Sequence, residues 1–414
     1  MSEDFVLVTA ALERLRCCTF GTHLDAFCAR WAELGYQPAT IRSKLGVVGN
    51  LARWMEQEQV ALADLDEPRV EAFLASRRGC GGTGRGSRRT ALQLLEQLRE
   101  AGLVRAPELI REATPGAALV ARYVDYLRAE RALAPATLTG YLPFVRAFVL
   151  ERLGDGAISP GEVRARDVRD FLLVRVGDMA PRYAQQMAIA LRSFLRFLFL
   201  TGETETNLAL AVPTVRQWRL AGVPRGLAAP EVERLLDACD LTAAIGRRDR
   251  AILLLMARLG LRAGEVVALE LDDLRWRDGA IVVRGKGLMR DRLPLLSEVG
   301  DALARYLRSD RPAGASRRVF LCRRAPYRGF AHASSVSTIV ARALARAGLA
   351  PPTRGAHLLR HGLATALLRR GASLSEIGEL LRHRSPATTE IYAKLDFDAL
   401  RDVALPWPTA GGAR

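Results

Sequence analysis

Cysteine, histidine, lysine and long apolar runs are all scarce in this chain of 414 residues. The six cysteines are dispersed without the spacing of a metal-binding cluster, which is typical of thiols kept reduced in a cytosol and argues against a disulfide framework or a zinc site. No apolar run approaches the roughly 18 residues that span a bilayer. The start, MSEDF, carries acidic residues where a secretory signal would carry basic ones. We therefore expect a soluble, cytoplasmic protein with no membrane partner.

The charge of the chain is strongly one-sided. The formal net charge is +16 and the sequence pI is about 10.4, which predicts a polyanionic partner and, first of all, nucleic acid. Residues 1–110 carry 14 basic and 14 acidic side chains, residues 111–222 carry 15 and 11, and residues 223–414 carry 32 and 20. The excess thus lies in the C-terminal part. Almost all of it is arginine, so the three lysines (Lys44, Lys286 and Lys394) stand out.

A diverged internal repeat occupies the first half of the chain. LGYQPATIRSKLGVVGNLARW (residues 34–54) echoes RALAPATLTGYLPFVRAFVLE (residues 131–151), with the two Pro-Ala-Thr triplets in register. The echo continues at separations of 97 to 100 residues, from Pro38 and Pro135 to Leu95 and Leu195. Both copies predict four or five amphipathic helices.

A basic, glycine-rich segment, RRGCGGTGRGSRR, lies within the first copy at residues 77–89. We expect it to be a loop. Such a loop could contact a DNA backbone, but a solvated, flexible connection is the simpler interpretation of this composition.

The remaining chain predicts a linker and a third domain. Prolines and glycines break the helical pattern at residues 211–226. Helical spacing then returns, with Gly260 as a predicted C-cap, and residues 280–296 predict a β-hairpin around a Gly-Lys-Gly turn. The predicted domains are residues 1–110, residues 111–210, and residues 227–414 after the linker.

Three of the five histidines lie in HLLRHGLATALLRRGASLSEIGELLRHRSPATTEIYAK, residues 357–394. His357 and Arg360 are three residues apart and share one helix face. Ser373 and Glu376 have the spacing of a capping box for the next helix, which has a buried stripe (Ile377, Leu380 and Leu381) and ends near His383.

A last helix is expected to present the tyrosine. Ser385 and Pro386 suit the N-cap and first position of this helix, which carries Tyr392. Tertiary packing of these helices could bring two arginines, two histidines and a phenol together.

The order of these motifs resembles the tyrosine recombinases, also called phage-type integrases. The resemblance covers most of residues 223–396, and every catalytic position of the family is occupied: Arg262, Lys286, His357, Arg360, His383 and Tyr392. It implies a mainly α fold with a small β-hairpin or sheet, made of two helical SAM-like N-terminal domains and an α+β catalytic domain. It also implies a 3′-phosphotyrosyl bond to DNA, with no ATP, cofactor or metal.

The chemistry of the residues agrees with that resemblance. Guanidinium groups hold phosphate oxygens bidentately and stay charged, which suits Arg262 and Arg360. A phenol with an ordinary pKa near 10 needs help to attack, and His357 is the expected proton acceptor. Lys286, on a hairpin near two arginines, suits the general acid for the departing 5′-oxygen.

Three further expectations concern His383, Glu265 and His361. His383 is expected to donate a hydrogen bond to the phosphate. Glu265, one turn after Arg262, is expected to orient the basic cluster, and His361 is expected to lie just outside the site.

The same residues also allow other interpretations. Any one histidine or tyrosine is more often structural than catalytic. His357 and His361, four apart on a helix, could ligate a metal, but no further ligand pattern completes a site. The expected function is a site-specific recombinase of a mobile element, acting as a tetramer on double-stranded DNA in the nucleoid. The alternatives are a type IB-like topoisomerase and a DNA-binding accessory protein, and the amphipathic tail at residues 395–407 favours the recombinase only weakly.

Overall fold

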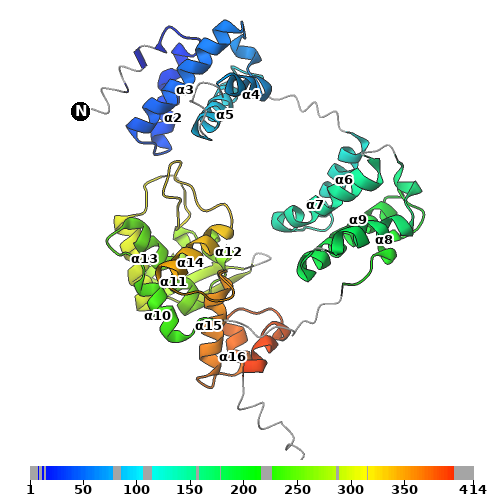
Figure 1. Ribbon diagram of the computed structural model, residues 1–414. Coiled ribbons are helices and arrows are strands. Elements are labelled where there is room, and N and C mark those ends of the chain that lie inside the picture. Colours follow the sequence, from blue (N-terminus) through cyan, green and yellow to red (C-terminus); the bar gives the residue numbers. More distant parts are fainter. Residues whose placement is uncertain are drawn as a thin grey trace, which may run out of the picture. The chain divides into compact units, whose positions relative to one another are not determined.

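The computed structural model describes residues 15–77, 85–105, 114–154, 158–177, 179–215, 226–285, 289–314 and 316–395, together with residues 8, 12 and 13. Helices dominate this part of the chain, and its strands form one small sheet (Figure 1). The expected fold class, mainly α with a small sheet in the C-terminal part, is thus confirmed. Within the same ranges, no helix is both long and apolar enough to cross a bilayer.

The described part of the first copy forms four α-helices: α2 (Leu24–Glu33), α3 (Pro38–Gln57), α4 (Glu67–Ser76) and α5 (Arg85–Glu100). Proline at the first position of α3 has the fixed φ that a helix start requires. Asp66 caps α4, because its carboxylate accepts the backbone N–H of Arg69 at 2.9 Å. The apolar faces bury Trp31 and Phe73 in a core of their own.

The basic segment at residues 77–89 is not a loop throughout. Helix α5 begins at Arg85, and on it Arg88 forms an ion pair with Glu71 of α4 at 2.7 Å. Residues 78–84 of the predicted loop lie outside the described ranges.

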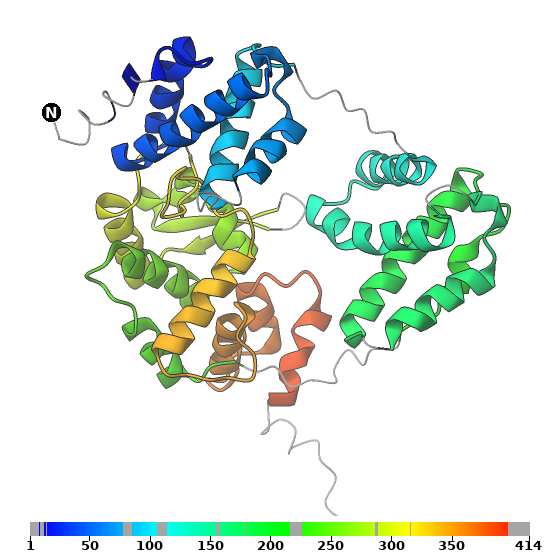
Figure 2. The same cartoon turned by 45° about the horizontal axis from the view of Figure 1, so that its top comes forward.

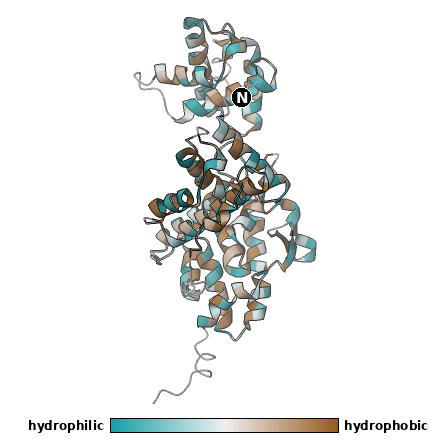
Figure 3. Ribbon diagram, turned by 90° about the vertical axis from the view of Figure 1, so that its right-hand side faces the viewer, coloured by the Kyte–Doolittle hydropathy of each residue, from teal (hydrophilic) through white to brown (hydrophobic). Residues whose placement is uncertain are grey.

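The second copy forms α6 (Pro115–Ala129), α7 (Pro135–Arg152), α8 (Ala165–Val176) and α9 (Pro181–Leu200). Aromatic side chains fill its core, with Phe148 packed edge-on against Phe171 at 5.2 Å between ring centroids. Figure 3 colours the ribbon by hydropathy and shows hydrophobic and hydrophilic residues interspersed along the helices.

The two copies have the same sequence of helices, as the repeat predicts. The Pro-Ala-Thr triplets open α3 and α7, and the long last helices α5 and α9 are each followed by a glycine with positive φ. These are Gly102, with φ 72°, and Gly202, with φ 77°, both in the left-handed region that favours glycine. The same local chemistry therefore ends both copies.

The chain divides into two compact units. One comprises Met1–Arg105 together with Val223–Arg414, and the other is Ala106–Gly222. Three separate large hydrophobic cores lie within residues 20–104, 119–212 and 227–359. The boundaries predicted from the sequence stay a prediction, and residues 216–225 of the linker lie outside the described ranges.

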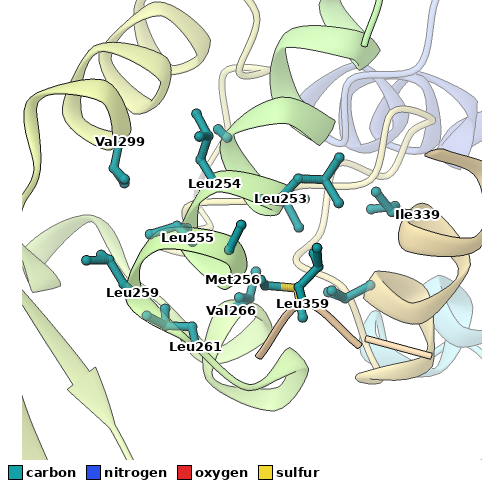
Figure 4. Close-up of a cluster of buried hydrophobic side chains, with 14 of the residues drawn as sticks. Leu253, Leu254, Leu255, Met256, Leu259, Leu261, Val266, Val299, Ile339 and Leu359 are labelled. Atoms are coloured by element: carbon teal, nitrogen blue, oxygen red, sulfur yellow. The ribbon is translucent and has the colours of Figure 1, made fainter. Parts of the chain in front are cut away.

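Seven α-helices build the described C-terminal part: α10 (Ala229–Asp237), α11 (Ala244–Leu259), α12 (Ala263–Ala268), α13 (Ser297–Ser309), α14 (Ser334–Arg346), α15 (His357–Leu368) and α16 (Leu374–Leu380). Helix α11 is the centre of the core. It packs against α13, α14 and α15, and Figure 4 shows the side chains of α11 between Val299 on one side and Ile339 and Leu359 on the other. Burial on all sides fixes α11, and with it the residues that follow its end.

The sheet is antiparallel in the order β1-β2-β3, with β1 (Leu274–Arg275), β2 (Ala280–Arg284) and β3 (Arg290–Pro294). Strands β2 and β3 form the predicted hairpin, in the register Ile281 to Leu293 (Figure 2). β1 is an additional short strand that the sequence did not indicate. Lys286 follows β2 and precedes β3 in the sequence, and it lies outside the described residues.

The segment that carries Tyr392 differs from its prediction. Instead of one α-helix it forms two short 3₁₀ helices, Pro386–Thr388 and Glu390–Leu395. Pro386 does occupy the first helical position after Ser385, but the Ser385 side chain makes no capping hydrogen bond. The predicted amphipathic tail beyond residue 395 lies outside the described ranges.

Candidate active site

Arg262 lies at the junction between α11 and α12. Gly260 ends α11 with φ 60°, and a Cβ added there would lie 2.6 Å from a methyl of Leu381, so both conformation and space require glycine. Arg262 then occupies the N-cap of α12, where its backbone N–H donates to Glu265 Oε2 at 2.8 Å and its Nη1 donates to Oε1 at 2.7 Å. Its side chain is 37% exposed, so it stays accessible to a ligand.

Glu265 orients Arg262, as the spacing predicts, and it remains ionised. Burial raises the pKa of its carboxyl. The hydrogen bond from the Arg262 backbone and the charges of Arg382 and Arg262 outweigh burial and hold this pKa below its ordinary value. The carboxylate is therefore a fixed negative centre beneath the arginines.

Arg360 is buried on α15. Its guanidinium donates to the carbonyl oxygens of Gly260 and Leu381. Burial and then the positive charges of Arg262 and Arg382 lower its pKa to about 10, so it stays charged at neutral pH. Mutual repulsion among these arginines favours an anion between them, and a phosphate is the anion whose oxygens fit guanidinium forks.

Helix α16 begins with the predicted capping box. Ser373 Oγ accepts the Glu376 N–H at 3.2 Å, and Glu376 Oε2 accepts the Ser373 N–H at 2.8 Å. Ile377 and Leu381 are fully buried, whereas Leu380 is half-buried. The helix is thereby fixed, and the chain emerges from it toward His383.

His383 is hydrogen-bonded to Thr389, with 2.7 Å between Nδ1 and Oγ1. Burial and then the charges of Arg360 and Arg262 lower its pKa to about 4, so the ring is neutral at pH 7. Because Thr389 engages Nδ1, a proton on Nε2 would allow the ring to donate to an oxygen of a ligand.

Tyr392 is buried, only 1% exposed, and its hydroxyl lies 2.7 Å from Nδ1 of His361. Burial raises the pKa of the phenol to about 12. Burial and then the charges of His357 and Arg360 lower the pKa of His361 to about 4. The phenol therefore keeps its proton, and the neutral imidazole can accept it in a hydrogen bond.

The six predicted catalytic residues fall in three groups. His357 is exposed on the first turn of α15, with its ring centroid 6.2 Å from that of His361. Arg262, Arg360, His383 and Tyr392 are brought together around residues 381–383. The position of Lys286 lies outside the described residues.

Sequence reasoning missed the closeness of two residues. His361 contacts Tyr392 directly, although we expected it just outside the site; His357 and His361 are one turn apart, so spacing alone could not tell which one meets the phenol. Arg382 places its buried guanidinium 2.9 Å from Glu265 Oε2. In the sequence, only its position directly before His383 points to a role for Arg382.

The arrangement combines guanidinium groups that can bind an anion with a buried phenol nearby, which are the groups that phosphoryl transfer to tyrosine requires. Among the described residues, no group of three or more His, Cys, Asp or Glu side chains could hold a metal ion. His357 and His361 therefore have no third ligand of these kinds in the described ranges.

Comparison with known proteins identifies the class. Residues 225–398 match the phage integrase family, and residues 120–202 match the phage integrase N-terminal SAM-like domain. The protein y4rA of Sinorhizobium fredii, which carries the name integrase/recombinase, is 43% identical over 92% of this chain and 93% of its own length. Tyrosine recombinase XerC of Oceanobacillus iheyensis is 31% identical over 70% of this chain and 96% of its own length. The chain belongs to the phage integrase family of tyrosine recombinases.

Solved structures show the same fold. The site-specific recombinase XerH, in a post-cleavage complex with its palindromic difH substrate, has a TM-score of 0.55 at 19% identity, covering 80% of this chain and 93% of that one. The lambda integrase tetramer bound to a Holliday junction has a TM-score of 0.51 at 18% identity, covering 80% and 91%.

Proposed function

We propose that this protein is a site-specific DNA recombinase that cleaves and rejoins DNA strands through a 3′-phosphotyrosyl intermediate, in the service of a mobile element. The observation that carries the proposal is the convergence of Arg262, Arg360, His383 and Tyr392 around residues 381–383. Arg360 donates to the Leu381 carbonyl, and Arg262 donates to the Arg382 carbonyl at 3.3 Å.

Each proposed catalytic residue has a distinct task. Arg262 and Arg360 hold the non-bridging oxygens of the scissile phosphate, on which negative charge grows during attack. His383 donates a further hydrogen bond to that phosphate. Tyr392 attacks phosphorus, and Lys286 protonates the departing 5′-oxygen. The phosphotyrosyl bond retains the energy of the broken phosphodiester, so rejoining needs no nucleotide cofactor.

The described conformation is a resting form in this proposal. A phenol that is 1% exposed and has a pKa near 12 cannot attack a phosphodiester of a DNA duplex. Tyr392 must leave its place beside His361 when DNA binds. His357, which is exposed at the start of α15, is the proposed proton acceptor once the phenol has moved.

The proposed partner is double-stranded DNA, held by a tetramer of this chain. The net charge of +16, concentrated after residue 222, supports the DNA partner. The tetramer is proposed by likeness to lambda integrase, whose tetramer binds a Holliday junction.

A topoisomerase is the second candidate, because nicking and rejoining one strand uses the same residues. The two differ in what they do to a plasmid that carries the DNA flanking this gene. A recombinase produces new junctions between two sites, and Tyr392→Phe abolishes them. Relaxation of supercoils on any plasmid, without new junctions by PCR and sequencing, would favour the topoisomerase and overturn the proposal.

A further inference from the structure

Arg382 has an unusual backbone for an arginine. Its φ is 54°, in the left-handed region where a residue with a Cβ is strained. It stands directly between the end of α16 and His383. Such strain persists only when the surrounding contacts hold the residue in place.

The side chain of Arg382, which is only 6% exposed, makes such contacts through its guanidinium group. Nη2 donates to Glu265 Oε2 at 2.9 Å, and Nη1 donates to the Leu380 carbonyl at 3.1 Å. A buried charge is tolerated only with such partners, because removal from water is otherwise unfavourable. Two backbone hydrogen bonds hold the same turn, from the Arg382 N–H to the Glu379 carbonyl at 2.9 Å and from the His383 N–H to the Gly378 carbonyl at 2.8 Å. The side chain and these backbone bonds therefore hold Arg382 in place together.

The guanidinium also reaches toward the hairpin of Lys286. Its Nε is buried without a hydrogen-bond partner in the described part of the chain, and it lies 4.0 Å from Asp291 Oδ2 on β3. The Asp291 carboxylate in turn lies beside Gly285, since a Cβ added to that glycine would be 3.9 Å from Oδ2. Gly285 directly precedes Lys286.

Arg382 thus connects three segments that each carry a proposed catalytic residue. Through Glu265 it reaches the start of α12 and Arg262, through Asp291 it faces the hairpin, and along the chain it adjoins His383. Its own carbonyl accepts from Arg262 at 3.3 Å.

Sharing of Glu265 has an electrostatic effect. Oε1 binds Arg262 and Oε2 binds Arg382, so one carboxylate serves two guanidinium groups. Without Arg382, the carboxylate charge would act on Arg262 alone and reduce its pull on a phosphate. The buried arginine therefore leaves positive charge on Arg262 for a ligand.

We propose that Arg382 is a positioning residue of the strand-cleavage site, which aligns Arg262 and His383 and anchors the Lys286 hairpin before the phosphodiester arrives. This inference rests on the proposed function. It requires no contact between Arg382 and DNA, because the side chain is enclosed by protein.

The test compares Arg382→Gly with Arg382→Lys. Glycine accepts φ 54° without strain but removes the guanidinium. Lysine keeps the positive charge but cannot make the paired hydrogen bonds of a guanidinium. The exposed Arg370→Gly is the matched control, since it removes the same charge outside the site. For each variant, single-turnover formation of covalent adduct on target-site DNA, DNA affinity and thermal unfolding are measured.

We expect Arg382→Gly to slow adduct formation on the order of 10- to 100-fold, the effect of displacing groups by about 1 Å, with DNA affinity within about threefold. Arg382→Lys should recover part of the rate. Millimolar guanidinium ion, which can enter the vacated space, should accelerate Arg382→Gly and leave Arg370→Gly unchanged.

Three outcomes would overturn the inference. In the first, Arg382→Gly forms adduct within about threefold of wild type, well short of the expected misplacement effect. In the second, its rate falls only in proportion to a loss of folded protein, with no recovery by lysine or guanidinium. In the third, the wild type itself forms no adduct, and the proposed function then fails as well. If the wild type forms adduct and Arg382→Gly is equally active, the positioning role of Arg382 is refuted while the proposed function stands.

Discussion

At the scale of single residues, burial sets the protonation of the site. Tyr392 and His361 are both withdrawn from water, and burial moves their pKa values in opposite directions, to about 12 and about 4. Both groups are consequently neutral over the whole physiological range. Burial also lowers the pKa of Arg360, to about 10. A guanidinium with this pKa is still protonated at neutral pH, so Arg360 stays charged.

The arginines should matter for cleavage far more than for binding. Arg360→Ala or Arg262→Ala should slow formation of the covalent adduct by about 100- to 1000-fold, the scale for removing one preorganised charge-stabilising donor. Single-turnover assays at saturating DNA would measure this. Cleavage within about threefold of wild type would contradict their role, since that lies well below the expected scale.

Acid should destabilise the fold through its buried histidines. His361 and His383 have folded pKa values of about 4, below the ordinary 6.5, so the unfolded state binds more protons between these values. Their contribution to stability is present above pH 6.5 and is lost as pH falls toward 4. The melting temperature should therefore decline from about pH 7 to about pH 5, and the double variant His361→Gln, His383→Gln should decline less.

The paired carboxylate of Glu67 contributes little to a decline of the melting temperature above about pH 5. The pKa of Glu67, lowered by its hydrogen bond with Arg99, is about 2, so its effect begins only below about pH 4.5. A decline of equal size in wild type and in the double histidine variant would contradict the assignment.

The sequence predicts a set of candidate site residues, but not all the contacts among them. Arg262, Arg360, His383 and Tyr392 follow from motif order, and the structure brings all four together. The contact of Tyr392 with His361 depends on how the last segment packs, and that segment forms 3₁₀ helices that its Ser-Pro start did not distinguish from an α-helix.

At the scale of elements, helix ends and one hairpin place the chemistry. Signals of local origin were predictable: the Gly260 C-cap, the Ser373–Glu376 capping box and the β2–β3 hairpin all follow from residues close in sequence. Strand β1 is only two residues long, so it is too short to show a period of two, although its pairing with β2 is local in sequence.

The proposed role of Lys286 as general acid can be tested with a chemically modified substrate. Lys286→Ala should cleave ordinary DNA slowly, because the departing 5′-oxygen then lacks its proton donor. A 5′-phosphorothiolate substrate, whose sulfur departs without a proton, should restore the rate. If this variant cleaves the sulfur substrate no faster than ordinary DNA, Lys286 is not the general acid.

At the scale of the whole molecule, charge separates the two repeat copies from the C-terminal part. Residues 1–110 balance at 14 basic and 14 acidic side chains, although their helices follow the same order as those of the second copy. The nonspecific attraction of this part to DNA should be weak. We infer that it contacts partner subunits or a second short DNA site.

Deletion of residues 1–110 tests that inference. The large cores of the remaining chain contain no residue before 119, so they are kept. Affinity for the core recombination site should stay within about tenfold, ~1.4 kcal/mol, while synapsis or complete recombination is impaired. A much larger loss of affinity, with a shallower dependence on salt, would show that the segment grips the same DNA site.

The central claim is that the hydroxyl of Tyr392 forms the bond to DNA. The most direct measurement traps the protein on a nicked target-site duplex in excess EDTA, digests the complex, and identifies by mass spectrometry the peptide that carries a nucleotide. We predict a nucleotide on Tyr392 in the wild type, and no covalent adduct from Tyr392→Phe, which should still bind DNA because its basic surface is unchanged. An adduct formed by Tyr392→Phe, or a nucleotide on any other residue of the wild type, would contradict the account.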